Sequence, residues 1–194
     1  MASPTKAELR RAILAARRAL TPDTHDAEAD ALCRHLPNVV GAGQTVCAYV
    51  PIRFEPGSMA LLDTLLRLAG RVLLPVARDD AYGVPQPMQW GEYHPGRLVP
   101  ARLGLREPTE PWLPADALAE AVVVFAPALA VDRAGVRLGR GAGFYDRSLP
   151  SADPTARLVA VVRDDELVDE VPAEPHDVRM THALTPGRGL VELA

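Results

Sequence analysis

An unbroken apolar segment, Ala121–Phe125 (AVVVF), constrains the fold more than any other part of the sequence. Valine favours extended backbone, and a strand that is apolar on both faces is typical of a parallel sheet covered by helices on each side. Shorter apolar runs bounded by glycine or proline predict further strands around it. These are expected at Thr45–Val50, Val72–Leu74 (closed by Pro75), Met88–Trp90 and Leu158–Val162.

Helical segments alternate with the predicted strands. Three predicted helices each begin after a hydroxyl residue: Thr5, Thr21 and Ser58. The hydroxyl oxygen of such a residue can cap the first turn by accepting a hydrogen bond from a backbone N–H. Glu8 completes a capping box with Thr5, and a brief helix is expected at Asp116–Glu120. This alternation predicts an α/β protein, a three-layer α/β/α fold with a mostly parallel central sheet. A chain of 194 residues without an internal repeat or linker is expected to form a single domain over residues 1–194.

Composition and charge narrow the class of protein. A formal net charge of −4 provides no global field that would attract nucleic acid. The N-terminal arginines, Arg10, Arg11, Arg17 and Arg18, are interpreted as a solvated helix face. The two cysteines are too few for a disulfide framework, and the first residues contain no apolar run of the kind that directs secretion. We therefore expect a cytoplasmic protein with neither a membrane nor a nucleic-acid partner.

The segment RLGRGAGFYD, residues 137–146, is the chemically informative part of the chain. It follows the predicted central strand, and ligands of open α/β sheets bind beyond the carboxyl ends of the strands. Gly139, Gly141 and Gly143 occupy every second position, where glycine lets the backbone approach a ligand and turn its N–H groups toward an anion. The alternative interpretation of this glycine spacing is a hairpin turn. The spacing matches neither a P-loop nor a dinucleotide-binding fingerprint.

Charged residues in the same segment favour phosphate binding over a hairpin turn. Arg137 and Arg140 carry planar guanidinium groups that can grip phosphate oxygens in pairs. Asp146 adds a hard carboxylate oxygen, which suits Mg²⁺ shared with phosphates. The residues alone therefore predict an anion-binding loop, without naming the anion.

This segment resembles the signature of the 5-formyltetrahydrofolate cyclo-ligase family, in which Pro-Gly-x-x-Phe-Asp precedes Gly-x-Arg-Leu-Gly-x-Gly-x-Gly-Tyr-Tyr-Asp-Arg. The likeness covers most of the chain in order. Lys6 and Arg10 look like the family's N-terminal Lys-x-x-x-Arg, and Tyr49–Glu55 (YVPIRFE) looks like its substrate strand. Leu105–Pro108 is similar to its Gly-x-x-Glu-Pro element, and His176-Asp177 to its late acidic position. The signature is matched at Pro127, Asp132, Gly135, Arg137, Leu138, Gly139, Gly141, Gly143, Tyr145, Asp146 and Arg147.

Four positions depart from the family pattern. Ala128 replaces the glycine after the proline, and Val131 replaces the usual phenylalanine. Phe144 stands where many members have the first tyrosine, so a hydroxyl contact is lost there. Ala142 stands where some members carry lysine, so a cation over the phosphates has to come from another residue.

The resemblance implies an enzyme that converts 5-formyltetrahydrofolate and ATP to 5,10-methenyltetrahydrofolate, ADP and phosphate, with Mg²⁺ as cofactor. ATP would phosphorylate the formyl oxygen and N10 would attack the formyl carbon, a reaction that depends on positioning and charge stabilisation. Catalytic roles are implied for Arg140 and Tyr145, and Mg²⁺ binding for Asp146 and Asp177. Folate binding is implied for Val50, Glu55, Arg140, Gly141, Ala142, Gly143 and Phe144. ATP binding is implied for Lys6, Arg10, Arg137, Leu138, Gly139, Arg140, Gly141, Ala142, Gly143, Phe144 and Tyr145.

Other interpretations stay open at this point. Apart from the resemblance, Glu55 would be an exposed loop carboxylate and Asp177 a cap or turn residue. A sugar-phosphate isomerase or CoA transferase on a related scaffold is one alternative function, and a non-catalytic folate-binding or regulatory protein is another. The expected partners are small-molecule substrates, and the expected state is a monomer.

Overall fold

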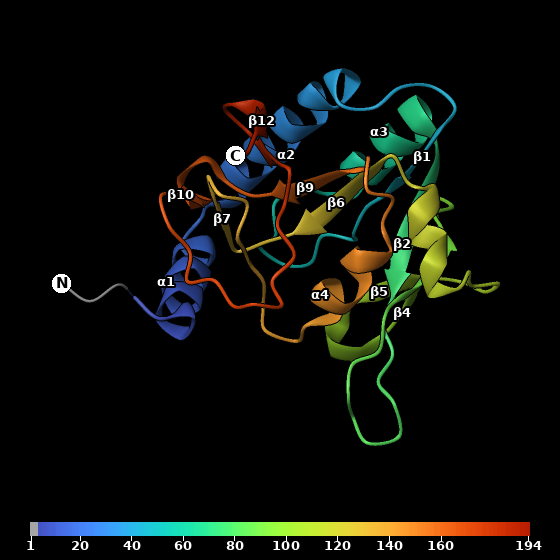
Figure 1. Ribbon diagram of the computed structural model, residues 1–194. Coiled ribbons are helices and arrows are strands. Elements are labelled where there is room, and N and C mark those ends of the chain that lie inside the picture. Colours follow the sequence, from blue (N-terminus) through green and yellow to red (C-terminus); the bar gives the residue numbers. More distant parts are fainter. Residues whose placement is uncertain (1–3) are drawn as a thin grey trace.

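The computed structural model describes residues 4–194, and Figure 1 shows helices arranged around one large sheet. Within these residues the sheet has seven strands: β1 (Gln44–Cys47), β2 (Gly70–Val76), β3 (Gln89–Glu92), β6 (Val123–Pro127), β9 (Arg157–Val161), β11 (His182–Thr185) and β12 (Gly189–Glu192). Their spatial order is β12-β11-β9-β6-β1-β2-β3. Neighbours from β11 to β2 run parallel, whereas β12 and β3 run antiparallel at the two edges. The prediction of a mostly parallel sheet is confirmed.

The three longer helices begin where the sequence predicts. They are α1 (Lys6–Arg18), α2 (Pro22–His35) and α3 (Met59–Ala69). The Thr5 hydroxyl accepts the Glu8 amide while the Glu8 carboxylate accepts the Thr5 amide, which confirms the capping box. Thr21 likewise caps α2 through the Thr24 amide. Ser58 precedes α3, but its side chain makes no capping hydrogen bond.

Successive residues of β6 point to opposite faces of the sheet and therefore enter two different cores. Phe125 packs with Leu32 of α2 and Leu61 of α3 on one face. Val124 packs on the other face with Leu118, which belongs to the 3₁₀ helix η3 (Ala115–Glu120). The three-layer α/β/α fold is confirmed, with short helical segments forming the second outer layer. The other short helices are η1 (Leu36–Asn38), η2 (Arg102–Gly104), α4 (Phe144–Ser148), η4 (Leu149–Ser151) and η5 (Asp164–Glu166).

The N-terminal helix packs beyond the carboxyl end of β6, against a small sheet. This sheet contains β7 (Ala130–Asp132), β8 (Arg137–Leu138) and β10 (Leu167–Val168), and Figure 1 shows α1 beside it. Leu9 and Ile13 of α1 contact a cluster that includes Leu129 and Leu138. Because the glycine-rich segment follows β8 directly, this packing brings α1 next to it. A further pair, β4 (Leu98–Pro100) and β5 (Arg106–Pro108), lies near β2 and β3.

Two elements differ from the sequence prediction for identifiable reasons. Pro75 lies inside β2 rather than closing it, opposite Trp90 of β3. The backbone N–H and C=O of Trp90 both form hydrogen bonds with Leu113. Trp90 therefore takes no backbone hydrogen bond from the residue opposite it in β2, and a proline, which has no N–H, can occupy that position. The brief helix expected at 116–120 is the 3₁₀ helix η3, which begins at Ala115.

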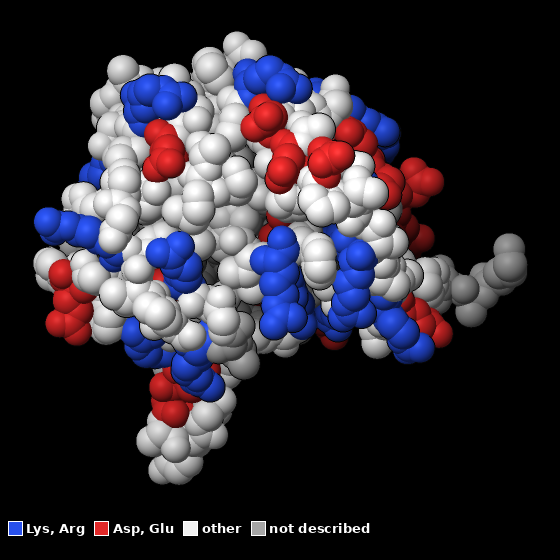
Figure 2. Space-filling view, turned by 180° about the vertical axis from the view of Figure 1, so that it is seen from behind, with Lys and Arg blue, Asp and Glu red and all other residues white. Residues whose placement is uncertain are grey.

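In the part of the chain that the structure describes, no helix combines the length and apolarity required to cross a bilayer. On the face seen in Figure 2, lysine and arginine side chains are intermixed with aspartate and glutamate, in keeping with the formal net charge of −4.

Candidate functional site

A cavity lies where β1, β2 and β6 end, at the carboxyl edge of the sheet. Its wall is formed by Tyr49 and Val50 after β1, Ala77 after β2 and Ala128 after β6. The whole glycine-rich segment from Gly139 to Asp146 lines the opposite side. This is the edge at which open α/β sheets bind ligands, so the topology brings the chemically informative segment to the expected place.

The glycine-rich segment connects β8 to α4 in a backbone shape that requires glycine. Gly141 has φ +100° and Gly143, the residue before α4, has φ +77°. Within residues 4–194, the amide N–H groups of 139–143 donate to no protein acceptor. The turn of the preceding hairpin lies between β7 and β8, so the hairpin interpretation of the glycine spacing is wrong. The segment is a strand-to-helix loop with a row of free N–H groups.

Arg137 is buried under this loop and is held by two acceptors. Its Nη1 donates to the Pro127 carbonyl at 3.2 Å and its Nη2 to Asp146 Oδ1 at 3.0 Å. Its Nε is buried with no partner among the described residues. A Cβ at Gly139 would lie 2.9 Å from Arg137 Nη1, so a side chain there would push this guanidinium away. The loop and the arginine therefore depend on each other for their positions.

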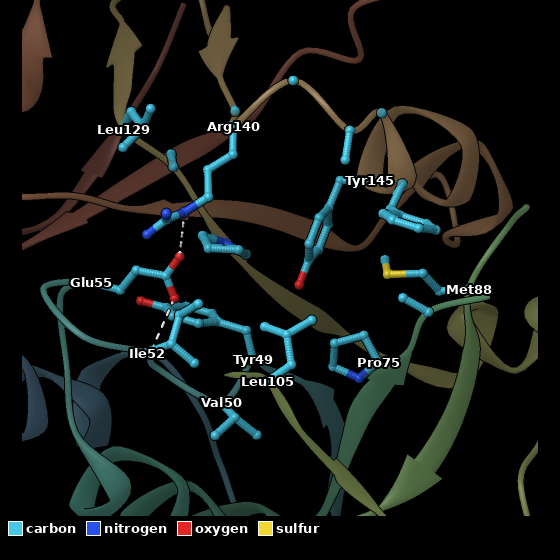
Figure 3. Close-up of a pocket in the computed structure, with 18 of the residues that line it drawn as sticks. Tyr49, Val50, Ile52, Glu55, Pro75, Met88, Leu105, Leu129, Arg140 and Tyr145 are labelled. Atoms are coloured by element: carbon cyan, nitrogen blue, oxygen red, sulfur yellow. Dashed lines mark hydrogen bonds and ion pairs between the residues drawn. The ribbon is translucent and has the colours of Figure 1, made fainter. Parts of the chain in front are cut away.

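Glu55 and Arg140 form an ion pair across the cavity, as Figure 3 shows. Arg140 Nε donates to Glu55 Oε1 at 3.0 Å, and the Ile52 amide donates to Oε2 at 3.2 Å. Burial raises the pKa of the Glu55 carboxyl, although Arg140 acts in the opposite direction. Glu55 is 6% exposed, so the alternative of an exposed loop carboxylate is wrong.

Tyr145 extends from the glycine-rich side, and Figure 3 shows its hydroxyl pointing into the cavity. This hydroxyl is buried and has no partner within residues 4–194. Burial raises the pKa of the phenol, so the group is a neutral donor at physiological pH. The Arg137 guanidinium lies 5.4 Å from the centroid of the tyrosine ring, in a cation–π contact. An unsatisfied hydroxyl of this kind is available to a ligand.

Helix α1 supplies two cations, of which Arg10 contacts the loop. Arg10 Nε donates to the Gly139 carbonyl at 2.9 Å, which ties the helix to the loop backbone. Lys6 Nζ lies 2.8 Å from Asp177 Oδ2 and 2.6 Å from Glu174 Oε2. The Glu174 amide also donates to Asp177 Oδ2 at 2.7 Å, so Asp177 does hold a turn.

The Lys6–Asp177 pair shifts the titration of both partners. Burial alone would raise the pKa of Asp177, but hydrogen bonds from Lys6 and from the Glu174 amide keep it below its usual value. Burial likewise opposes the charge of Lys6, but its two carboxylate partners raise its pKa. Together with His176, the two carboxylates bring three ligand atoms within 4.8 Å of one another.

Comparison with known proteins identifies the family. The model of the 5-formyltetrahydrofolate cyclo-ligase family matches residues 2–186. The chain belongs to the 5-formyltetrahydrofolate cyclo-ligase family. The family resemblance of the glycine-rich signature is thereby confirmed, and with it the prediction of an enzyme of this family.

Relatives in the cyclo-ligase family cover the chain almost completely. A 5-formyltetrahydrofolate cyclo-ligase of Mycolicibacterium smegmatis is 61% identical over 193 residues, covering 100% of both chains. One from Escherichia coli is 32% identical over 177 residues, covering 89% of this chain and 95% of that one. The solved 5,10-methenyltetrahydrofolate synthetase of Aquifex aeolicus has a TM-score of 0.77 at 21% identity, covering 96% of this chain and 92% of that one. The Mycoplasma pneumoniae synthetase has a TM-score of 0.69 at 18% identity, with 90% and 94% covered. The two structures support the shared fold.

The structure gathers most of the residues that the cyclo-ligase resemblance implies into one cavity. Its lining includes Val50, Glu55, Arg137, Gly139, Arg140, Gly141, Ala142, Gly143, Phe144, Tyr145 and Asp146. Four other implied residues lie outside the lining. Arg10 contacts the loop through the Gly139 carbonyl, and Leu138 is buried in β8. Lys6 and Asp177 pair with each other rather than with Asp146.

Sequence reasoning missed several residues of the cavity in this cyclo-ligase. Arg17 was expected on a solvated helix face, but it is 1% exposed and lines the cavity. The signal was present: Arg17 follows Leu9 and Ile13 at intervals of four, and so continues the buried stripe of α1. Glu107 and Met88 also line the cavity. Glu107 lies in the segment Leu105–Pro108, which resembles the family's Gly-x-x-Glu-Pro element, whereas no local motif marks Met88 as a site residue.

Proposed function

We propose that this chain catalyses the ATP- and Mg²⁺-dependent closure of 5-formyltetrahydrofolate to 5,10-methenyltetrahydrofolate. The observation that carries this proposal is the row of amide N–H groups at residues 139–143, which donate to no acceptor among the described residues and belong to a segment that lines a cavity with Tyr145 and the Glu55–Arg140 pair. Such a loop provides oriented donors for a triphosphate, and the cavity provides space for a second reactant next to it.

The chemistry follows from the poor leaving ability of a formyl oxygen. In the proposed reaction this oxygen attacks the γ-phosphorus of ATP, so that an O–P bond forms and the bond to ADP breaks. N10 then attacks the formyl carbon, the C–O bond breaks, phosphate departs with its electron pair, and N10 loses its proton. Because phosphoryl transfer depends on positioning and charge stabilisation, the protein needs donors and cations in fixed places rather than a nucleophile.

The site residues support distinct roles in this reaction. We assign the ATP phosphates to the amides of residues 139–143, to the free Nε of Arg137 and to Arg140. We also assign Lys6 and Arg10 of α1 to the phosphates, as additional positive charge. Leu138 and Phe144 flank the loop and fix where it begins and ends. Arg140 and Tyr145 are assigned to the reacting formyl group, because their side chains extend from the glycine-rich segment into the cavity.

The residues present also fit a magnesium ion. Asp146 lies in the cavity lining and uses Oδ1 for Arg137, which leaves carboxylate lone pairs for a hard cation. Asp177 has a depressed pKa and stays ionised, as a metal ligand must. We assign Asp146 to Mg²⁺, and Asp177 directly or through water. When bound, the ion neutralises charge that develops on the transferred phosphoryl group.

The opposite wall fits the folate. Val50 and Glu55 follow β1, and together with the apolar side chains of Ile52, Leu105 and Leu129 they form a surface suited to a fused ring. We also propose that the chain acts as a single-domain monomer in the cytoplasm on small-molecule substrates. Residues 17–146 of one chain assemble the cavity lining, and Cys33 and Cys47 are free thiols.

An absorbance assay for the methenyl product tests this proposal. Purified protein is incubated with 5-formyltetrahydrofolate, ATP and Mg²⁺, and ADP is measured in parallel. We expect one ADP for each methenyl product and no product when ATP or Mg²⁺ is omitted. Product without ATP would exclude a ligase, and tight folate binding without turnover would identify a non-catalytic folate-binding protein.

A further inference from the structure

Arg17 is a buried cation that none of the proposed roles uses. Its Nε and Nη2 donate to the two carboxylate oxygens of Glu166 at 2.6 and 2.7 Å, and Nη2 also donates to the Ala128 carbonyl at 2.6 Å. Arg17 is 1% exposed and Glu166 is 3% exposed. Three hydrogen bonds and close packing therefore hold the guanidinium in one position.

One edge of this guanidinium is free. Within residues 4–194, Nη1 of Arg17 has no hydrogen-bond acceptor. Because the guanidinium is planar and its Nε and Nη2 face Glu166, Nη1 lies on a different edge. Arg17 lines the cavity together with Tyr49 and Glu55. Burial raises the pKa of both of these residues, and the charge of Arg17 acts on each in the opposite direction.

The surroundings of Arg17 favour a neutral acceptor over a phosphate. Glu166 already balances its charge, and Glu55 contributes a second carboxylate to the same cavity lining. The negative charge of a phosphoryl group would be repelled by these two carboxylates. A neutral carbonyl oxygen would only have to accept a hydrogen bond from the free N–H of Nη1. Glu55 accepts hydrogen bonds from Arg140 and the Ile52 amide, and a carboxylate can accept about four in total. A donor and an acceptor with spare capacity thus line the same cavity.

We propose that Arg17 Nη1 donates a hydrogen bond to the ring carbonyl of the reduced folate, while Glu55 accepts from the ring N–H groups beside that carbonyl. The pair selects the 2-amino-4-oxo edge of the pteridine, which presents an acceptor next to donors. The inference rests on the proposed function because it takes a reduced folate as the ligand. Arg17 is thus a specificity-determining residue, and Glu166 is the positioning residue that holds it.

A binding comparison tests the role directly. The dissociation constants of 5-formyltetrahydrofolate and of its 4-amino-4-deoxy counterpart are measured by calorimetry with the wild-type protein, without ATP. The 4-amino compound turns an N–H toward Arg17, so that Nη1 stays without an acceptor, and it lacks the N3 proton that Glu55 would accept. We expect at least tenfold tighter binding of the 4-oxo compound. Equal affinities would overturn the proposal, and this result does not depend on whether the protein turns over its substrate.

Variants then separate recognition from folding. Arg17→Gln with Glu166→Gln replaces the ion pair by two amides and leaves no unpaired buried charge. Arg17→Lys keeps a cation beside Glu166 but loses the planar fork. Arg18→Gln, at the next and exposed position of α1, is the matched control.

We expect the preference for the 4-oxo compound to fall at least fivefold in the double variant and in Arg17→Lys, and to remain in Arg18→Gln. Circular dichroism identifies which variants are folded. If either folded Arg17 variant keeps the wild-type preference, the arginine is only structural and the proposal fails. Turnover by the wild-type protein, measured separately, distinguishes failure of this inference from failure of the proposed function.

Discussion

Arg140 Nε lies 3.0 Å from Glu55 Oε1, so an ion pair joins the glycine-rich loop to the segment that follows β1. The first residue belongs to the proposed ATP side of the cavity and the second to the proposed folate side. A ligand on the ATP side therefore meets Arg140, which is already paired with Glu55, and a ligand on the folate side meets Glu55, which is already paired with Arg140. The pair spans the gap that the two reactants have to share.

Arg140→Ala tests the importance of this charge. Loss of a charge-assisted contact of about 1.5–3 kcal/mol should lower kcat/KM by about tenfold to hundredfold. Steady-state kinetics with 5-formyltetrahydrofolate and ATP measures the effect, and Arg97→Ala, at an exposed position outside the cavity lining, serves as the control. Near-normal kinetics in Arg140→Ala would remove this arginine from the site.

Gly141→Ala tests the shape of the phosphate-binding loop. Gly141 has φ +100°, which an L-residue adopts only with strain of about 1–3 kcal/mol. Gly70→Ala is a close match, because Gly70 has φ +98°, no neighbour within 4 Å of an added Cβ, and a position outside the cavity lining. Both variants should lose similar stability in urea unfolding, but only Gly141→Ala should bind ATP more weakly. Equal ATP affinities in the two variants would show that the loop does not hold the nucleotide.

Tyr145→Phe should change stability and activity in opposite directions. A buried hydroxyl without a partner costs about 1–3 kcal/mol, so its removal should raise the free energy of unfolding by about 1 kcal/mol. Turnover should fall, because the proposed contact with the formyl group is lost. Urea unfolding and steady-state kinetics measure the two quantities. Lower stability of the Tyr145→Phe protein would mean that the hydroxyl already has a partner, and unchanged turnover would remove it from the reaction.

The layers of the fold are predictable because they depend on local patterns. The apolar run that becomes β6 must be covered on both faces, and hydroxyl residues before α1 and α2 cap those helices. Pro75 is different, since its tolerance inside β2 depends on Trp90 pairing with Leu113, a residue far along the chain. No local pattern contains that information.

In the site, too, residues that belong to one local pattern are predictable from sequence and long-range contacts are not. The glycine spacing, together with Arg137 and Arg140, identifies the loop from sequence, because one continuous segment contains all of them. The ion pair of Arg17 with Glu166 joins residues 149 positions apart, so the partner of Arg17 is known only from the folded structure, in which η5 meets α1. The i, i+4 continuation from Ile13 to Arg17 was the one sequence signal for the burial of Arg17.

Asp146→Asn tests the assigned metal ligand. The neutral amide is a weaker ligand for a hard cation, so the Mg²⁺ concentration for half-maximal activity should rise about tenfold. A magnesium titration of turnover measures this shift, with Asp26→Asn on the exposed surface of α2 as the control. The variant also removes the partner of Arg137, so its melting temperature should be measured in parallel. An unchanged magnesium titration would contradict the role of Asp146.

Lys6→Met tests the pair that links α1 to the segment around Asp177. The pKa of Asp177 lies below its ordinary value of 3.8, so the stabilisation is present above that pH and is lost as the pH falls through the depressed pKa. The pKa of Lys6 lies above 10.5, so its contribution is present below that pH and is lost as the pH rises through the raised pKa. The variant should therefore lose about 1 kcal/mol or less between these limits, a size typical of a partly exposed ion pair.

Urea unfolding of the wild-type and Lys6→Met proteins at a series of pH values measures this difference. The difference should be constant near neutral pH and should shrink when the solution becomes more acidic than pH 3.8. Added salt should reduce it as well, because the pair is near the surface. The control, Arg11→Lys, changes a cation on the exposed face of α1 without reaching Asp177, and should leave the pH profile as it is in the wild type. A difference that persists unchanged into acid would mean that Lys6 stabilises the fold through its hydrocarbon chain, and that Asp177 is free of it.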